Sequence, residues 1–256
     1  MWKVQFDLTS PSPISLDFVI NDIMVGVTES FVQITAGNIQ AVNQNAAHTK
    51  ALYAATCCIN YLCWKYDAVL SINSERLNIE EIGPEGKTIS HAGYGSVGMW
   101  PTMVVADRPQ SLNSVSGKKS DAASYYRKGC LSTDSFDQFQ NFYSAVENIS
   151  KKIYKKQPGE PEKIELDRAL TECFGGKLQS LEVIAKAEPT FNTHEPTISK
   201  VTRILYKAYR CQLNHPKDYQ GKKVLFDTLD EIEVMNALPL VKFVAKALLG
   251  YEESSL

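Results

Sequence analysis

The chain has 256 residues, 44% of them hydrophobic and 22% charged, which is enough to bury the core of one large domain or two small ones. Its formal net charge of -2 excludes a chain-wide attraction for nucleic acid or anionic membranes, so a polyanion would have to bind a local patch. No stretch approaches the roughly 20 continuous apolar residues of a membrane helix, and the six cysteines show no CxxC pair or other spacing typical of zinc sites.

Residues 2–7 alternate between apolar and polar side chains, as in a strand. This N-terminal segment lacks the basic start and uninterrupted apolar run of a signal peptide. We therefore expect a cytoplasmic protein with reduced thiols and no membrane contact.

Short runs of β-branched and aromatic residues, punctuated by proline and glycine, predict strands in the first part of the chain. These runs are 2–8, 14–25, 31–39, 77–82, 88–92 and 97–105. From about Val42 to Tyr66, apolar residues recur at three- and four-residue steps, which predicts a helix with one buried stripe that includes Cys58. Residues 1–110 are therefore predicted to form an α+β domain with a mixed sheet and one long helix.

Residues 107–120 are rich in Pro, Ser, Asn, Gly and Lys, and we interpret them as a linker or domain boundary. After them the strand pattern ends and helical periodicity begins. Helices are predicted at 135–154, from Pro161 to Phe174, at 177–187, from Thr197 towards Arg210, and at 227–249. Pro239 should kink or split the last of these. Residues 118–256 are therefore predicted to form an all-α bundle.

The segment from Arg210 to His215, RCQLNH, carries the strongest chemical signal. On one unbroken helix, a five-residue offset would turn the two side chains about 140° apart. Pro216 pushes the residue before it out of the helical region, so His215 should lie at the helix end and turn back towards Arg210. A permanent guanidinium charge beside a group that titrates near neutral pH suits phosphodiester chemistry, in which His215 moves a proton and Arg210 stabilises phosphoryl charge. That chemistry needs neither a metal nor a cofactor.

A helical bundle with Arg-x4-His near the end of its penultimate helix resembles the HEPN superfamily, whose members share a bundle and an Arg-x4-6-His motif. Within residues 135–149, the runs SFDQF and YSAVENI resemble the glutamate-bearing helix of the HEPN branch related to methylamine-utilisation and abortive-infection proteins. That branch also carries an N-terminal α+β unit with a long helix. The resemblance covers mainly residues 120–250.

The resemblance implies a metal-independent endoribonuclease that acts as a homodimer, serves as a toxin or effector in prokaryotic defence or stress response, and leaves a 2′,3′-cyclic phosphate. It implies His215 as general acid or base and Arg210 as phosphate clamp, with Asn214 or Glu147 as an orienting group. A regulatory protein or small-molecule activator is a further expected partner. The candidate RNA-binding residues are Tyr209 and a basic run beside the motif, Lys217, Lys222 and Lys223.

Several alternatives stay open. Cys211 stands where many active members have a polar residue, which favours a non-catalytic dimerisation or interaction module whose N-terminal domain senses a ligand or a protein. Glu147 lies at the margin of its helix's apolar face, so a surface salt bridge is its alternative role. Gly93–Gly98 matches GxGxxG, but Pro101 opposes the helix that a dinucleotide site needs, so a loop or hairpin is favoured. A second basic run, Lys151, Lys152, Lys155 and Lys156, suits a solvated helix end.

Overall fold

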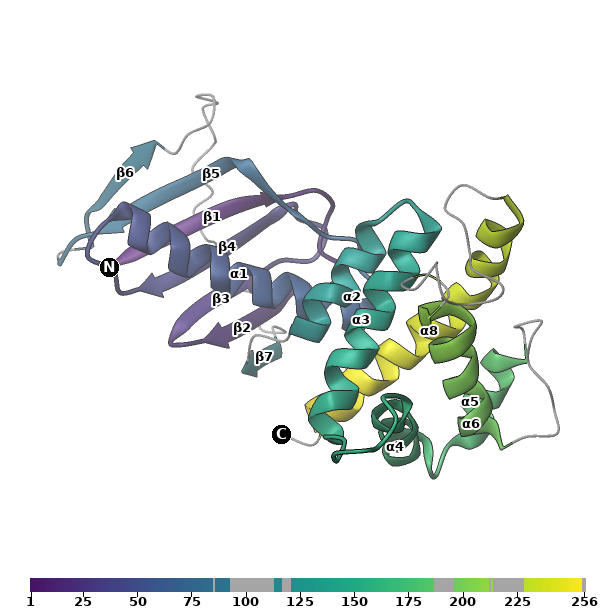
Figure 1. Cartoon of the computed structure of the whole chain (residues 1–256). Helices are drawn as coiled ribbons and strands as arrows, with labels where there is room; N and C mark the ends of the chain where they lie inside the picture. Colours follow the sequence, from purple (N-terminus) through teal and green to yellow (C-terminus); the bar gives the residue numbers. More distant parts are fainter. Residues whose placement is uncertain are drawn as a thin grey trace. The chain divides into compact units, whose positions relative to one another are not determined.

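The computed structural model describes residues 1–84, 86–92, 113–116, 121–186, 196–211, 213 and 228–254. The chain divides into two compact units, Met1–Ser120 and Asp121–Leu256. The first combines a sheet with one long helix, and the described residues of the second are helical apart from their connections (Figure 1). The predicted α+β class, with strands first and helices afterwards, is confirmed.

Among the described residues, seven strands form one sheet in the order β6-β5-β1-β4-β3-β2-β7. Their bounds are β1 Trp2–Leu8, β2 Leu16–Ile20, β3 Ile23–Val27, β4 Gln33–Ile39, β5 Ile72–Ile82, β6 Thr88–Ala92 and β7 Asn113–Ser116. All neighbours pair antiparallel except β2 and β7, which are parallel, so the sheet is mixed as predicted. The interpretation of 107–120 as a linker is wrong for β7, whose backbone hydrogen-bonds to β2 although its composition is typical of loops. The predicted strand 97–105 lies outside the described residues.

Strand β1 shows why the alternating pattern forms a sheet with one covered face. Val4 and Phe6 are 0% and 1% exposed, whereas Gln5 between them is only partly buried. The predicted strand 14–25 is wrong in its extent, because the chain turns at Asn21 and Asp22 and makes two strands, β2 and β3. Both turn residues have positive φ, 49° and 65°, a conformation that asparagine and aspartate tolerate better than most residues.

Helix α1, Gln44–Tyr66, covers one face of this sheet. It begins after Asn43, whose side chain accepts a hydrogen bond from the Ala46 amide at 2.9 Å. Its buried side contains many small residues, which lets the helix approach the strands closely: Ala47, Ala51, Ala54, Ala55, Cys57, Cys58 and Cys63. The predicted core position of Cys58 is confirmed, since its side chain is 0% exposed.

The second unit contains the helices α2 Asp121–Leu131, α3 Ser135–Ile153, α4 Lys163–Phe174, α5 Leu178–Ala185, α6 Thr197–Thr202 and α8 Thr228–Ser254, with a π-helical stretch, η1 Arg203–Cys211. Helix α3 is central and packs against α2, α4, η1 and α8. Its N-terminus is capped by Asp134, whose side chain accepts a hydrogen bond from the Asp137 amide at 2.9 Å. Aromatic side chains fill much of its buried side: Phe136, Phe139, Phe142 and Tyr143.

Three features of this unit differ from the prediction. Helix α2 was not predicted, because only Ala122, Ala123 and Tyr126 mark its apolar side. Helix α8 is not split, since it continues through Pro239. Proline has no amide hydrogen, so Pro239 leaves the carbonyl of Met235 without its helical hydrogen bond. Both residues lie on the exposed side of α8, where water can bond to that carbonyl. The third difference is η1, which was expected to be α-helical.

Two helical glycines provide a matched test of this packing. A Cβ atom added to Gly129 in α2 would lie 2.8 Å from the buried ring of Phe142 in α3, whereas one added to Gly250 in α8 meets no atom within 4 Å. We expect Gly250→Ala to raise the free energy of unfolding by about 0.5–1 kcal/mol, because alanine restricts the unfolded chain. Gly129→Ala should lower it by on the order of 1 kcal/mol, because overpacking exceeds that gain. Melting curves of both variants should shift in opposite directions, and a stabilised Gly129→Ala would contradict the close contact of α2 with α3.

Candidate functional site

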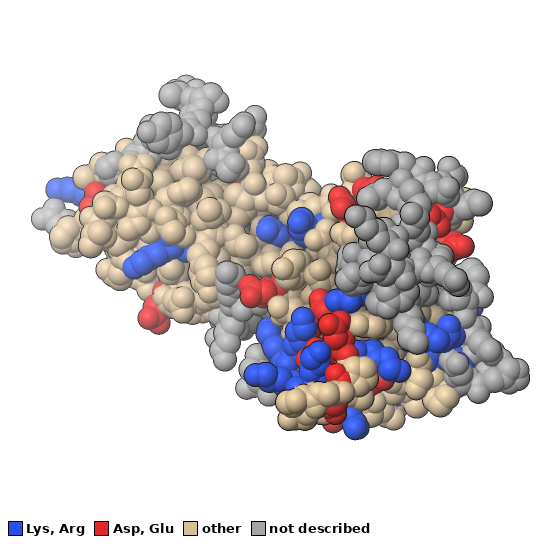
Figure 2. All heavy atoms as spheres, viewed as in Figure 1, with Lys and Arg blue, Asp and Glu red and all other residues tan. Residues whose placement is uncertain are grey.

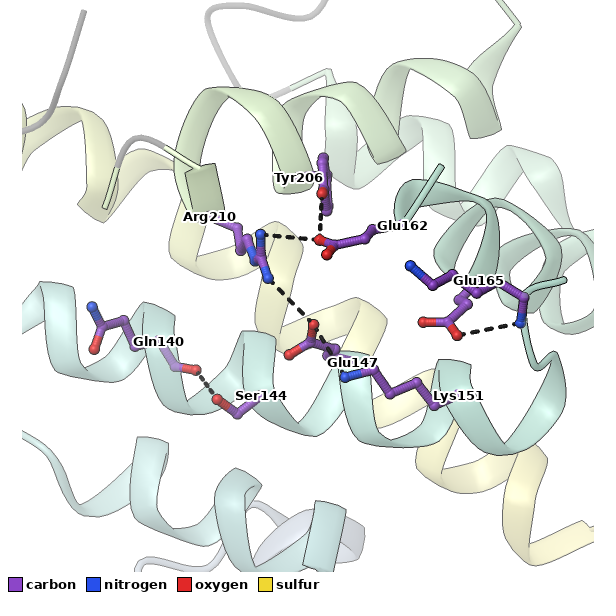
Figure 3. Close-up of polar contacts among 9 residues, drawn as sticks. Gln140, Ser144, Glu147, Lys151, Glu162, Glu165, Tyr206 and Arg210 are labelled. Atoms are coloured by element: carbon purple, nitrogen blue, oxygen red, sulfur yellow. Dashed lines mark hydrogen bonds and ion pairs between the residues drawn. The ribbon is translucent and has the colours of Figure 1, made fainter. Parts of the chain in front are cut away.

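The polar groups of interest lie along one side of α3. Gln140, Ser144, Glu147 and Lys151 follow one another at steps of four, three and four residues, which places them on one face of a helix. Side chains from η1 and from the start of α4 reach this face (Figure 3). Three segments that are distant in the sequence therefore contribute to one polar cluster.

The η1 stretch positions two of these side chains. Its backbone has the i→i+5 hydrogen bonds of a π-helix, a rare form that occurs frequently at functional sites. Ile204, Leu205 and Tyr209 are buried on its inner side, at most 1% exposed. Tyr206 and Arg210, four residues apart, are on the other side, and the guanidinium carbon of Arg210 lies 5.2 Å from the centre of the Tyr206 ring.

Arg210 lies between two carboxylates. Its Nη2 is 3.6 Å from Oε1 of Glu147 in α3, and its Nη1 is 3.4 Å from Oε2 of Glu162, the residue before α4. The Arg210 side chain is 17% exposed, so the guanidinium has lost much of its contact with water and depends on these counter-charges. Arg210 thus links α3, η1 and the start of α4 (Figure 3).

Glu162 is held by two neighbours. Its Oε2 accepts a hydrogen bond from the Tyr206 hydroxyl at 2.8 Å. This hydrogen bond lowers the pKa of Glu162 from its usual value; slight burial opposes the shift, and the positive charge of Arg210 adds to it. Glu162 is therefore ionised in the folded protein over a wider pH range than an unperturbed glutamate.

Glu147 also pairs with Lys151, one turn further along α3, at 3.4 Å. Two carboxylates, Glu147 and Glu162, thus face two cations, Arg210 and Lys151, and these four formal charges cancel. Figure 2 shows basic and acidic side chains intermixed over the part of the second unit where α3 and α4 lie. In the second basic run, Lys152 also pairs with an acid, Glu252, at 2.7 Å. The surface around Arg210 is therefore mixed in charge and not uniformly basic.

A pocket of about 90 Å³ adjoins this cluster. Its described walls are Phe139, Gln140, Tyr143, Ser144, Glu147, Arg210 and Leu213. The pocket therefore combines aromatic side chains of α3 with an amide, a hydroxyl and the Arg210–Glu147 ion pair.

The structure brings two predicted site residues together, since Glu147 and Arg210 form an ion pair on this pocket. Tyr209 is 1% exposed, its hydroxyl donates to the Glu233 carbonyl at 3.1 Å, and its ring lies 5.3 Å from that of Phe139. A ring buried in this way cannot stack on an RNA base, so Tyr209 has a packing role in place of the predicted RNA contact. The other predicted residues, Asn214, His215, Lys217, Lys222 and Lys223, lie outside the described residues, as do Gly93–Gly98.

The site residues that the sequence does not predict are Glu162, Gln140, Ser144 and Tyr206. The spacing of Gln140, Ser144 and Glu147 on the polar side of α3 was a usable signal. No sequence signal marks Glu162, because it precedes α4 and lies outside helical periodicity. It approaches Arg210 only through the packing of α4 and α6.

Other chemistries have little support among the described residues. No group of three His, Cys, Asp or Glu side chains within them could hold a metal ion. Burial raises the pKa of the Cys173 thiol to about 11 and that of Cys58 still further, so neither is a thiolate nucleophile near neutral pH. No helix in the described ranges is long and apolar enough to cross a membrane.

The Glu162 contacts make stability dependent on pH. Because its folded-state pKa is lowered, Glu162 contributes stability above the pKa of an unfolded glutamate and loses that contribution as the pH falls through the folded value. We expect Tyr206→Phe to raise the pKa of Glu162, because it removes the largest cause of the shift. Carboxyl ¹³C NMR titration measures this directly, with Tyr125→Phe on the exposed side of α2 as the control. An unchanged Glu162 titration in Tyr206→Phe would contradict the hydrogen bond.

Comparison with known proteins gives no family for the chain. No family model matches it, and neither does any curated protein or solved structure. The chemistry of the cluster around Arg210 is therefore the basis on which a function is assigned.

Proposed function

We propose that the second unit is a metal-independent endoribonuclease of the HEPN type, with Arg210 and His215 as its central catalytic residues. The observation that carries this proposal is the 3.6 Å ion pair between Arg210 and Glu147, beside a pocket. The sequence alone predicts both residues as members of one site. We further propose that the protein acts in the cytoplasm as a homodimer and serves as a toxin or effector in prokaryotic defence or stress response.

The proposed reaction is an internal transfer within RNA. His215 accepts the proton of the 2′-hydroxyl, whose oxygen bonds to the adjacent phosphorus. The bond from phosphorus to the 5′-oxygen breaks, and that oxygen receives a proton. The products are a 2′,3′-cyclic phosphate and a 5′-hydroxyl end, so DNA cannot react. Arg210 stabilises the negative charge that develops on the phosphoryl oxygens.

The two carboxylates support this role by orienting Arg210. Glu147 and Glu162 contact different guanidinium nitrogens, Nη2 and Nη1, at 3.6 and 3.4 Å, and the Tyr206 ring lies 5.2 Å from the guanidinium carbon. These ion-pair distances are longer than those of charged hydrogen bonds, so a phosphodiester that hydrogen-bonds to the guanidinium competes with the carboxylates. Preorientation of this kind reduces the side-chain entropy lost when substrate binds.

The test is cleavage of a structured RNA by purified protein in EDTA. We expect the wild type to cut it, and His215→Ala to lower the rate by about 100-fold or more, as for the loss of a general acid or base. Arg210→Ala should lower the rate similarly. Arg168→Ala is the matched control, because Arg168 also lies over a tyrosine ring, that of Tyr154 at 5.8 Å, but belongs to α4 and does not line the pocket.

Two further measurements separate this mechanism from others. A substrate with a 2′-deoxy sugar at the cut site should remain intact, and the product should carry a 2′,3′-cyclic phosphate. Cleavage that requires magnesium, or that proceeds equally in His215→Ala, would show that the mechanism is wrong.

A second candidate function is a non-catalytic dimerisation or interaction module. The observation in its favour is the same cluster, since the charge of Arg210 is already matched by Glu147 and Glu162 and the side chain links three segments. In this case Arg210 stabilises the bundle and no turnover depends on it.

This alternative predicts a loss of stability or assembly in Arg210→Ala. The substitution removes the ion pair of Glu162 and leaves Glu147 with Lys151 alone, so the link between three segments is lost. The melting temperature should therefore fall, or the mass in light scattering should change. The wild type should cut no RNA in EDTA. An Arg210→Ala variant with the melting temperature and mass of the wild type excludes the scaffold role.

A further inference from the structure

We infer that the Glu162 carboxylate occupies, in the free protein, the place of the RNA phosphate that Arg210 binds. The anion site defined in this way consists of the Tyr206 hydroxyl, the Arg210 guanidinium and the ammonium groups of Lys151 and Lys156. This inference rests on the proposed function, because it places the substrate phosphate in the cluster around Arg210. It goes beyond that function by naming three further side chains that bind the phosphate and one acidic residue that competes with it.

Two donors from η1 converge on a single oxygen of Glu162. The Tyr206 hydroxyl donates to Oε2 at 2.8 Å, and Nη1 of Arg210 lies 3.4 Å from the same oxygen. Figure 3 shows both side chains pointing towards Glu162. The contact of the guanidinium with the Tyr206 ring, at 5.2 Å, keeps the two donors side by side. Such a pair of donors suits a phosphate oxygen as well as a carboxylate oxygen, because both acceptors are anionic.

Two lysines extend the positive charge of the anion site. The pKa of Glu162 is lowered first by the hydrogen bond from Tyr206 and then, against the effect of slight burial, by the charges of Arg210, Lys156 and Lys151. Both ammonium groups are therefore within electrostatic range of the carboxylate. Lys151 belongs to α3, and Lys156 lies in the connection from α3 to α4. Groups from α3, this connection and η1 thus favour an anion at one position.

Of the two carboxylates beside Arg210, Glu162 is the one that can give way. Its side chain is 55% exposed, whereas that of Glu147 is 35% exposed. Glu162 precedes α4 and makes no side-chain capping hydrogen bond to that helix. Glu147 lies within α3, lines the pocket and also pairs with Lys151. Glu162 can therefore turn into water while Glu147 continues to orient Arg210.

The exchange of Glu162 for a phosphodiester preserves the balance of charge. An ionised carboxylate and a phosphodiester each carry one negative charge and present two oxygens to a guanidinium. The Arg210 side chain is only 17% exposed, so it needs an anion at close range with or without substrate. Glu162 supplies that anion in the free protein and must be displaced by RNA, so its charge weakens substrate binding.

Binding of an oligonucleotide that cannot be cleaved tests this inference. We would measure the fluorescence anisotropy of a labelled 2′-O-methyl hexauridine with the wild type, Glu162→Gln and Glu182→Gln. Glu182 is the matched control, because it pairs with a lysine of α5's end, Lys186, at 2.9 Å and its replacement makes the same change in net charge. The Glu162 side chain is mostly exposed, so Glu162→Gln should stay folded, which a melting curve checks.

We expect Glu162→Gln to bind the oligonucleotide about tenfold more tightly than the wild type, an effect between those of one charge at contact distance in water and near a protein surface. Glu182→Gln should stay within about twofold of the wild type, because salt screens a charge outside the site. Adding Tyr206→Phe to Glu162→Gln should weaken binding about tenfold, because the phosphate loses a donor. The inference is overturned if Glu162→Gln binds no more tightly than Glu182→Gln, or if the added Tyr206→Phe leaves its affinity unchanged.

The Glu162 carboxyl reports the exchange directly in the wild type. When the phosphate takes its place, Glu162 loses the Tyr206 hydrogen bond, so its pKa should rise towards the ordinary value. Carboxyl ¹³C NMR titration with saturating hexauridine measures this rise, and an unchanged titration would contradict the exchange. Inorganic phosphate is the second ligand to test. If it produces the rise at lower concentration than the oligonucleotide, the site belongs to a free phosphate and the assignment to RNA is wrong.

These outcomes are independent of those for cleavage. The 2′-O-methyl group blocks attack by the 2′-oxygen, so binding is measured without turnover. Tighter binding by Glu162→Gln in a protein that cuts no RNA would retain the anion site and reject the nuclease. Cleavage in EDTA by a protein whose RNA binding ignores Glu162 would retain the nuclease and reject the anion site.

Discussion

A single guanidinium largely withdrawn from water determines the organisation of the polar side of the bundle. Arg210 has no neutral form near physiological pH, so its burial requires negative partners at close range. Glu147 comes from α3 and Glu162 from the residue before α4, and both approach it from different sides. The cost of leaving the Arg210 charge without these partners therefore favours one arrangement of α3, α4 and η1.

The π-helical stretch explains how Arg210 reaches this position. In η1 the wider turn brings residues four and five apart towards one side, so Ile204, Leu205 and Tyr209 point into the core. Tyr206 and Arg210 then share the opposite side, where the ring contacts the guanidinium and its hydroxyl holds Glu162. The same backbone irregularity thus supplies both the cation and a positioning group for its counter-charge.

The elements with strong periodicity could be predicted from the sequence, and the weaker ones could not. The alternation in β1 and the apolar stripe of α1 predicted both elements nearly to the residue. Helix α2 has few large apolar residues, and β7 has a loop-like composition, so both are formed by tertiary contacts that local patterns do not contain. The position of a turn was also missed by the sequence pattern, since Asn21 and Asp22 divide one predicted strand into two.

The candidate site was predictable only where its residues carry a recognisable chemical pattern. Arg210 is predicted from its place in Arg-x4-His and Glu147 from its helix, and the structure brings these two residues together in an ion pair. Tyr209 was misassigned because an aromatic residue next to an arginine suggests stacking, whereas its position on the inner side of η1 buries it. Glu162 depends on a long-range contact and is invisible to local sequence patterns.

The parallel strand β7 has a consequence for how the first unit can be isolated. It closes the β2 edge of the sheet and is supplied by residues just before the second unit begins. A fragment that stops at residue 110 lacks this strand and presents the bare amides and carbonyls of β2 to solvent. Such an open edge pairs readily with another chain, so a shortened N-terminal fragment is prone to self-association, whereas one that extends to Ser120 retains its protecting strand.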